Sequence, residues 1–278
     1  MKRGLSHYAL SYLLLLILSL ATSCVADTKW NEIEFYEVSK SKHFTEKNVS
    51  NEDDEFAALH SDGERLFDTQ VRMQFMQSNN GISEDVCRRI NALLIEKLLG
   101  LSGEYSADEA VEAYIEEKET QFHRDRLVRE YVDQTVGEAE YGFENVINYR
   151  LVQNVFAGGA HPSTTTTVLC FNAMTGDFIS LDNVFPVSSH DALIRLLTAR
   201  LMQMNGVGTM EGLRKKGYLE DSEMFVTTNF ALRKDSIEFY YNEYEIAPYA
   251  YGPSTICLDY ATVEQLMNTI EERRLVDF

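Results

Sequence analysis

The sequence predicts an α+β fold: an antiparallel β-sheet with helices packed mainly on one face, preceded by an N-terminal α/β subdomain. Two observations support this class. Stretches of alternating apolar and polar residues are joined by links of hairpin length, which favours antiparallel strands. Between them lie stretches in which apolar residues recur every three or four positions, as they do on amphipathic helices.

The first half of the chain combines strand-like and helical patterns. Residues 69–76 alternate like a strand, and from Ser83 the apolar residues follow helical spacing as far as Gly100, a C-terminal cap residue. A second helix is predicted to begin at Ser106, because Glu109 three residues later completes a capping box. This half therefore predicts a strand followed by two helices.

The second half is richer in β-structure. Helices are expected over residues 190–204 and, at the C-terminus, over residues 261–273. The segments expected as strands are 143–156, 164–172, 178–181, 225–232, 236–241 and 255–258. The predicted domains are a lipoprotein signal peptide (1–23), a lipidated N-terminus with tether and edge strand (24–64), a strand–helix–helix subdomain (65–140) and a C-terminal domain (141–278).

The N-terminus has the layout of a bacterial secretory signal. Lys2 and Arg3 precede an apolar run at 13–20, and small residues then lead to Cys24. Cys24 is therefore predicted to be lipidated, which places the rest of the chain in the bacterial cell envelope, attached to a membrane through this anchor only. The alternative is an uncleaved anchor, because the uncharged stretch over 4–26 is nearly long enough to span a bilayer.

The charge balance restricts the partners. The chain has 25 basic and 44 acidic residues, a net charge of −19. Residues 1–23 hold two basic and no acidic residues, so the mature chain has 23 basic residues against 44 acidic ones, a net charge of −21. Nucleic acid is excluded as a partner, since phosphate binding needs the opposite sign. A cationic partner is favoured, and the alternative is that acidity keeps an exported protein soluble.

Cysteine and histidine usage indicates neither a metal nor a cofactor. No His-Glu-x-x-His, Cys-x-x-Cys or phosphate-binding glycine pattern occurs. Cys170 and Cys257 both lie in strand-like segments, so a disulfide between them is one interpretation, and the other is that these two and Cys87 are buried free thiols.

Two short segments stand out from the rest of the chain. The first is AGGAHP, ending at Pro162, and the second is YEIAPYAYGP, ending at Pro253. They hold three of the four prolines of the chain, and both lie between predicted strands. Rigid turns with glycine and proline at set positions are therefore expected at both places.

Together these segments resemble the RsiV-like domain of unknown function. That domain is found in extracytoplasmic parts of lysozyme-sensing anti-sigma factors and beside some peptidoglycan deacetylases. The resemblance runs from about residue 141 to the C-terminus and implies an envelope module used for ligand recognition. We identify no sigma-binding segment and no appended catalytic domain, so neither complete function carries over.

The expected function is therefore non-enzymatic binding of a cationic protein such as lysozyme, or of a cell-wall saccharide. The candidate ligand-binding residues are Gly158, Gly159, His161, Pro162, Tyr244, Glu245, Tyr249 and Tyr251. One alternative is an enzyme acting on the cell wall, with His161 and Glu245 as an acid–base pair. Another is a structural assembly component whose two turns only hold the sheet in place.

Overall fold

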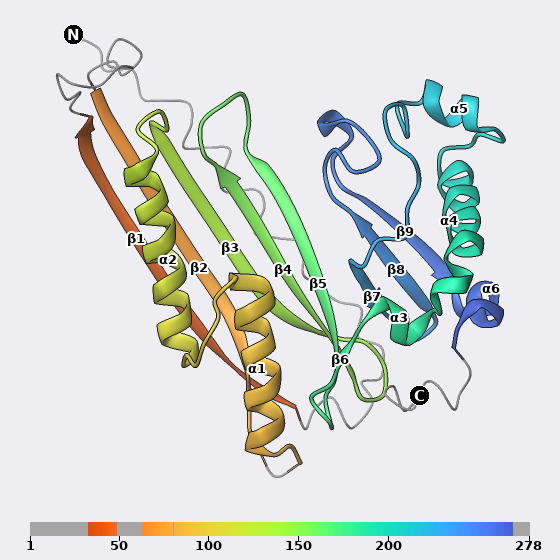
Figure 1. The fold of residues 1–278 in the computed structure, drawn as a ribbon, viewed down its shortest axis with the longest axis horizontal. Helices are drawn as coiled ribbons and strands as arrows, with labels where there is room; N and C mark the ends of the chain where they lie inside the picture. Colours follow the sequence, from red (N-terminus) through yellow and green to blue (C-terminus); the bar gives the residue numbers. More distant parts are fainter. Residues whose placement is uncertain (1–32, 49–62, 80, 269–278) are drawn as a thin grey trace, which may run out of the picture.

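The computed structural model describes residues 33–48, 63–79 and 81–268. It confirms the α+β class, with a six-stranded and a three-stranded sheet over these residues (Figure 1). In the larger sheet the strands follow chain order: β1 (Glu34–Asn48), β2 (Gly63–Gln77), β3 (Glu130–Tyr141), β4 (Val146–Phe156), β5 (Ser163–Asn172) and β6 (Phe178–Ile179). The smaller sheet consists of β7 (Phe230–Leu232), β8 (Ser236–Tyr241) and β9 (Ser254–Asp259).

The larger sheet contains one parallel pair. β2 and β3 run in the same direction, whereas all other neighbours in both sheets are antiparallel. The reason is the connection between them, since α1 (Glu84–Leu99) and α2 (Ala107–Arg124) carry the chain back across the sheet. β1 is an edge strand, as expected, but it begins at Glu34 and is 15 residues long.

Both predicted helix boundaries in this region are confirmed. The Ser83 side chain accepts a hydrogen bond from the Val86 amide, and Gly100 ends α1 with φ 72°. Ser106 and Glu109 form the reciprocal capping box at the start of α2. These two helices cover one face of the larger sheet (Figure 1).

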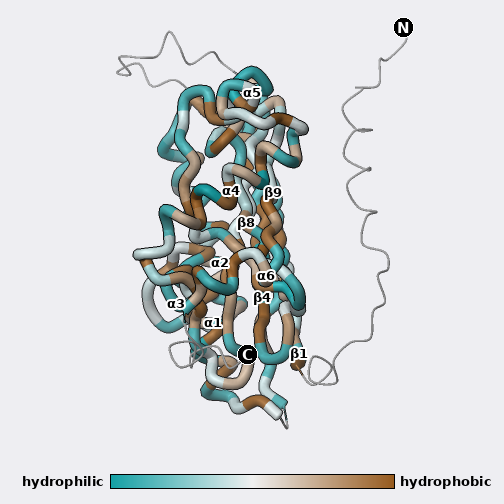
Figure 2. Tube along the Cα trace, turned by 90° about the vertical axis from the view of Figure 1, so that its right-hand side faces the viewer, coloured by the Kyte–Doolittle hydropathy of each residue, from teal (hydrophilic) through white to brown (hydrophobic). Residues whose placement is uncertain are grey.

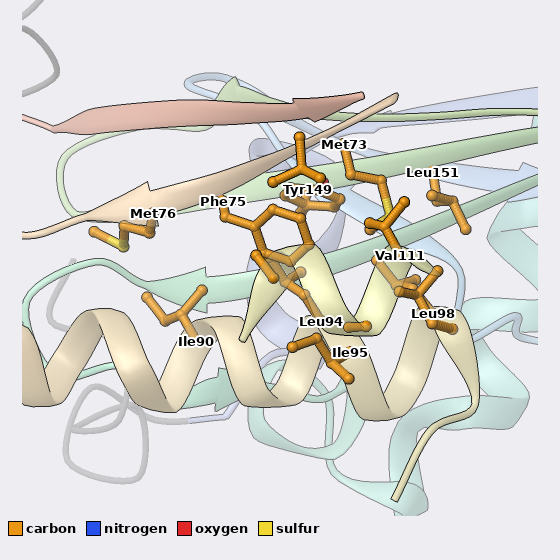
Figure 3. Packing of buried hydrophobic residues seen from close by; sticks show 14 of the residues in the cluster. Met73, Phe75, Met76, Ile90, Leu94, Ile95, Leu98, Val111, Tyr149 and Leu151 are labelled. Atoms are coloured by element: carbon orange, nitrogen blue, oxygen red, sulfur yellow. The ribbon is translucent and has the colours of Figure 1, made fainter. Parts of the chain in front are cut away.

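The first apolar core lies between this sheet and its helices. Figure 3 shows side chains of β2 and β4 in contact with those of α1 and α2. The buried residues labelled there are Met73, Phe75, Met76, Ile90, Leu94, Ile95, Leu98, Val111, Tyr149 and Leu151. A large buried apolar surface of this kind is the main favourable term in folding.

A second apolar core joins the smaller sheet to the remaining helices, which are α3 (Leu181–Val184), α4 (His190–Met204), α5 (Met210–Lys215) and α6 (Tyr260–Val263). Figure 2 shows hydrophobic positions along β4 and β9, while α5 at one end of the molecule is mostly hydrophilic. The expected domain boundary at residues 140/141 falls between β3 and β4, which are neighbours in one sheet.

The predicted helix over 261–273 is wrong in length. α6 ends at Val263, one 3-10 turn (Glu264–Leu266) follows, and Met267 is extended with ψ 156°. The helix stops because the Asn268 amide donates to Val184 O, and its side chain donates to Asp182 O and Asn183 O. The strand expected over 225–232 is also shorter, since β7 begins at Phe230.

Several predictions concern residues outside the described ranges. The signal peptide and Cys24 are among them. Within the described ranges, the helices are all too short or too polar to cross a membrane.

Candidate functional site

The two conspicuous segments meet at one end of the molecule. The turn at 157–162 joins β4 to β5, and the loop at 242–253 joins β8 to β9. The His161 ring lies flat on the Tyr249 ring, with centroids 3.5 Å apart and planes 15° from parallel. His161 Nε2 is 3.2 Å from Tyr244 Oη. We call His161, Tyr244 and Tyr249 the ring cluster.

The hydrogen bonds of His161 fix its tautomer. Its Nδ1 lies 2.9 Å from Pro162 O, and a carbonyl oxygen only accepts, so Nδ1 carries a proton. In the neutral imidazole Nε2 then accepts, and the Tyr244 hydroxyl is its donor. The ring cluster therefore has no free histidine nitrogen in this state.

The loop shape that presents these rings is unusual for a tyrosine. Tyr244 has φ 68°, in the left-handed region that costs an L-residue about 1–2 kcal/mol. The turn is closed by Tyr244 N–H to Ala247 O and by Glu245 N–H to Asn242 O. Glu245 closes it further, since its Oε2 accepts from the Asn242 amide at 2.8 Å.

Asparagine side chains fix the loop to the larger sheet. Asn242 Oδ1 accepts from Thr166 N at 2.8 Å, and its Nδ2 donates to Thr166 O at 3.1 Å. Asn229 repeats the pattern, accepting from Val168 N and donating to Thr166 O, both at 2.7 Å. These amides satisfy the backbone groups along one edge of β5, as a neighbouring strand would.

A third asparagine joins the two sheets further inside. Asn148 is fully buried in β4, donates to Leu232 O and accepts from Leu232 N, both at 2.9 Å. Sequence reasoning missed all three asparagines. The signal that could have found Asn148 is a polar amide in the middle of the apolar run of β4.

The ring cluster is open to solvent on one side. Tyr244 is 62% exposed, and Tyr251 beside it in the loop is 52% exposed and packs edge-on against Tyr218. Pro162 is exposed as well, whereas His161 and Tyr249 are half-buried. The cluster thus offers aromatic faces held in place from beneath.

The two motif glycines give the turn its backbone shape. Gly158 and Gly159 have φ 83° and 102°, and a methyl group added at either would meet no atom within 4 Å. Their role is the left-handed backbone of the turn, where glycine costs least.

The structure brings His161 together with Tyr244 and Tyr249, but Glu245 acts elsewhere. The polar partners of the His161 ring are Pro162 O and Tyr244 Oη, and Glu245 is occupied by the Asn242 amide. The arrangement therefore differs from the acid–base pair considered above, since a general base must lie within hydrogen-bond reach of its partner.

Cys170 and Cys257 do not form the disulfide considered above; both are free thiols. Cys170 in β5 is buried, with its Sγ against Asn148 Oδ1 and Phe230 O. Cys257 lies in β9, where it pairs with Glu238 of β8. In the smaller sheet β8 lies between β9 and β7. The two cysteines are thus separated by the strands of the smaller sheet.

Two cavities occur away from the ring cluster. One, of about 330 Å³, lies where the sheets meet and is lined by residues such as Thr167, Phe178 and Asn229. The other, of about 1050 Å³, lies beside α1. Within the described ranges no three histidine, cysteine or acidic side chains are grouped so that they could hold a metal ion.

One known protein family matches a part of the chain that includes the second of the two loops. Residues 182–261 match DUF3298, described as a protein of unknown function. The matched segment includes the loop at 242–253, whereas His161 lies outside it. No curated protein is significantly similar to the chain.

Two solved structures of DUF3298 family proteins share the fold. One is from Bacteroides fragilis NCTC 9343, with a TM-score of 0.73 and 23% identity, covering 88% of this chain and 98% of that one. The other is from Pseudomonas aeruginosa PAO1, with a TM-score of 0.54 and 13% identity, covering 83% and 94%. The chain thus shares its fold with these DUF3298 family proteins, and its residues 182–261 match the model of that family.

Proposed function

We propose that this protein is a lipid-anchored binding protein of the bacterial cell envelope, and that it binds a cationic protein such as a lysozyme through the ring cluster. The observation that carries the proposal is the exposed ring of Tyr244 beside the stacked pair of His161 and Tyr249, with the exposed Tyr251 in the same loop. Tyrosine is enriched in the contact centres of protein interfaces, because it offers an apolar ring and a polar hydroxyl together.

The charge of the chain supports a cationic partner. A net charge of −19 gives a field that attracts positively charged proteins and speeds their encounter. The resemblance of the two turns to the RsiV-like domain agrees with this partner class. A cell-wall saccharide is the second candidate, because the same exposed rings can stack on the apolar faces of sugars.

The preformed loop also favours binding. The rings are held by the hydrogen bonds of Glu245, Asn242 and Tyr244 described above, so little freedom is lost when a ligand binds. Such preorganisation raises affinity by lowering the entropic cost of association.

Titration calorimetry with hen lysozyme at increasing salt tests the proposal. We expect the affinity to fall steeply with salt, since exposed charges are screened over about 10 Å at 0.1 M. Tyr244→Ala is expected to weaken binding about tenfold or more, as contact-centre tyrosines do on truncation. Val187→Ala is the control, because Val187 is exposed and lies in the short turn before α4, outside both motif segments.

Four results would contradict parts of this proposal. If the wild type does not bind lysozyme, the proposal of a cationic protein partner is wrong. If it binds muropeptides with an affinity that salt does not change, the saccharide is the better candidate. A Tyr244→Ala variant that melts earlier but binds lysozyme like the wild type would indicate a structural role alone. Lipid labelling that is unchanged in Cys24→Ala would contradict the proposed lipid anchor at Cys24.

A further inference from the structure

The larger cavity lies on a different part of the molecule from the ring cluster. It occupies about 1050 Å³ between α1, the segment at 103–107 that leads into α2, and the ends of β1 and β2. This size is at the upper end of the range of about 300–1,000 Å³ for small-molecule sites. We call it the α1 groove.

Aromatic rings and apolar side chains form its surfaces. Tyr36 from β1 and Tyr105 from the segment before α2 line the groove and are 39% and 38% exposed. The buried Met76 and Ile95 form part of its lining as well. Tyr36 also packs against the buried Phe75 ring, with centroids 6.0 Å apart, so this aromatic wall is backed by the core. The exposed parts of the two tyrosines can be covered by apolar ligand surface.

A pair of hydrogen bonds joins the helix that lines the groove to the neighbouring strand. Asn91 on α1 accepts from Met76 N at 2.8 Å and donates to Met76 O at 2.9 Å, so the helix is fixed to the end of β2. Both Asn91 and Met76 line the groove. This wall of the groove is therefore fixed by the fold, as is usual for preformed ligand sites.

The polar groups around it include both donors and acceptors. Glu84 and Glu104 supply carboxylates, Gln77 an amide, and Arg88 a guanidinium that also pairs with Asp85. Burial, followed by the charge of Asp108, raises the pKa of Tyr36, so its hydroxyl stays protonated. A lining of both charge signs matches a ligand with many hydroxyl groups better than an ion of one sign.

We propose that the α1 groove binds a neutral oligosaccharide, with sugar rings against Tyr36 and Tyr105 and hydroxyl groups on the surrounding carboxylate, amide and guanidinium groups. The apolar C–H face of a sugar ring packs on an aromatic face, and its hydroxyls need donors and acceptors around it. This site is separate from the ring cluster and does not depend on the lysozyme proposal.

Titration calorimetry with two neutral probes, tetra-N-acetylchitotetraose and maltotetraose, tests the groove. We expect the wild type to bind at least one of them, with an affinity that is insensitive to salt. Tyr105→Ala is expected to weaken binding about tenfold, because it removes one stacking ring. Tyr105→Phe keeps the ring and is expected to restore most of the affinity.

A second variant blocks the groove without removing any buried side chain. Ala92 lines the groove and is exposed, so Ala92→Trp places a large side chain in the space that the sugar needs. We expect this variant to melt like the wild type and to lose binding. Leu127→Ala is the control and is expected to bind like the wild type.

Two outcomes would overturn the proposal. One is a wild type that binds neither sugar. The other is a wild-type affinity in Tyr105→Ala and Ala92→Trp together with lost binding in Tyr244→Ala, which would move the sugar to the ring cluster. A wild type that does not bind lysozyme, or a Tyr244→Ala variant that binds it normally, contradicts the lysozyme proposal and leaves the groove proposal unaffected, so the two proposals fail separately.

Discussion

The ring cluster and the α1 groove differ in how the chain builds them. The ring cluster is made by two segments rich in glycine, proline and tyrosine, and its side chains are largely occupied with one another. The α1 groove is made by a helix, two strand ends and a connecting segment with no unusual sequence pattern. Conspicuous motifs therefore mark where the backbone must take a particular shape, whereas the α1 groove is formed by segments without such motifs.

The same contrast holds for stability. In the ring cluster the motif residues shape one exposed loop, whereas Asn148 joins the two sheets from a buried position outside any motif. If this contrast is right, substitutions outside the motifs destabilise the protein more than substitutions within them.

The largest effect is expected for Asn148→Ala. It leaves the Leu232 N–H and C=O without their partners in a buried position, and each such group costs about 1–3 kcal/mol. We expect the free energy of unfolding to fall by about 3 kcal/mol in urea denaturation. Asn154→Ala is the control, because Asn154 is half-buried and donates only to the Thr164 hydroxyl. If Asn148→Ala and Asn154→Ala lowered the free energy of unfolding equally, the special contribution of the buried Asn148 to stability would be contradicted.

A smaller loss of stability is expected when a glycine inside the larger sheet is replaced by alanine. A methyl group at Gly137 in β3 would lie 2.5 Å from Tyr149 Oη and 3.0 Å from Met73 Cγ. Overpacking of this kind costs about 1–3 kcal/mol, so we expect Gly137→Ala to lose about 2 kcal/mol.

The motif glycine provides the matched comparison. Gly158→Ala meets no atom within 4 Å, and its cost comes only from φ 83°. We expect a loss of about 1 kcal/mol, measured by the same denaturation experiment. A larger loss for Gly158→Ala than for Gly137→Ala would show that the motif contributes more to stability than the sheet interior.

The last expected effect is absent at neutral pH and appears only at alkaline pH. Burial raises the pKa of Tyr149, whose hydroxyl donates to Gln74 O at 2.7 Å. The unfolded chain releases this proton above about pH 10, while the folded protein keeps it. The stability from this proton is therefore complete below pH 10 and is lost as the pH rises further, by about 1.4 kcal/mol per pH unit.

Tyr149→Phe sharpens this prediction. The free energy of unfolding of the variant should decline less steeply between pH 10 and 12 than that of the wild type. Some decline should remain, because burial raises the pKa of Tyr240 to about 12 and also raises that of Tyr114. Parallel curves for variant and wild type would show that Tyr149 does not titrate differently in the two states.

Local pattern predicted much of the fold. The boundaries of α1 and α2 followed from Ser83, Gly100 and the Ser106–Glu109 pair, because capping depends on neighbours within one turn. The predicted helix over 261–273 failed for the opposite reason. Its end depends on Asn268 and Val184, which are 84 residues apart in sequence.

In the candidate site, too, some features follow from the local sequence and others from contacts between distant residues. The sequence by itself determined that two rigid turns exist and which rings they carry, since glycine, proline and tyrosine act on their own stretch of backbone. Only the tertiary structure decided that His161 stacks on Tyr249, that Glu245 closes its own loop, and that a groove lies beside α1. Such contacts join residues far apart in the chain, and their partners are set by how the sheets and helices pack.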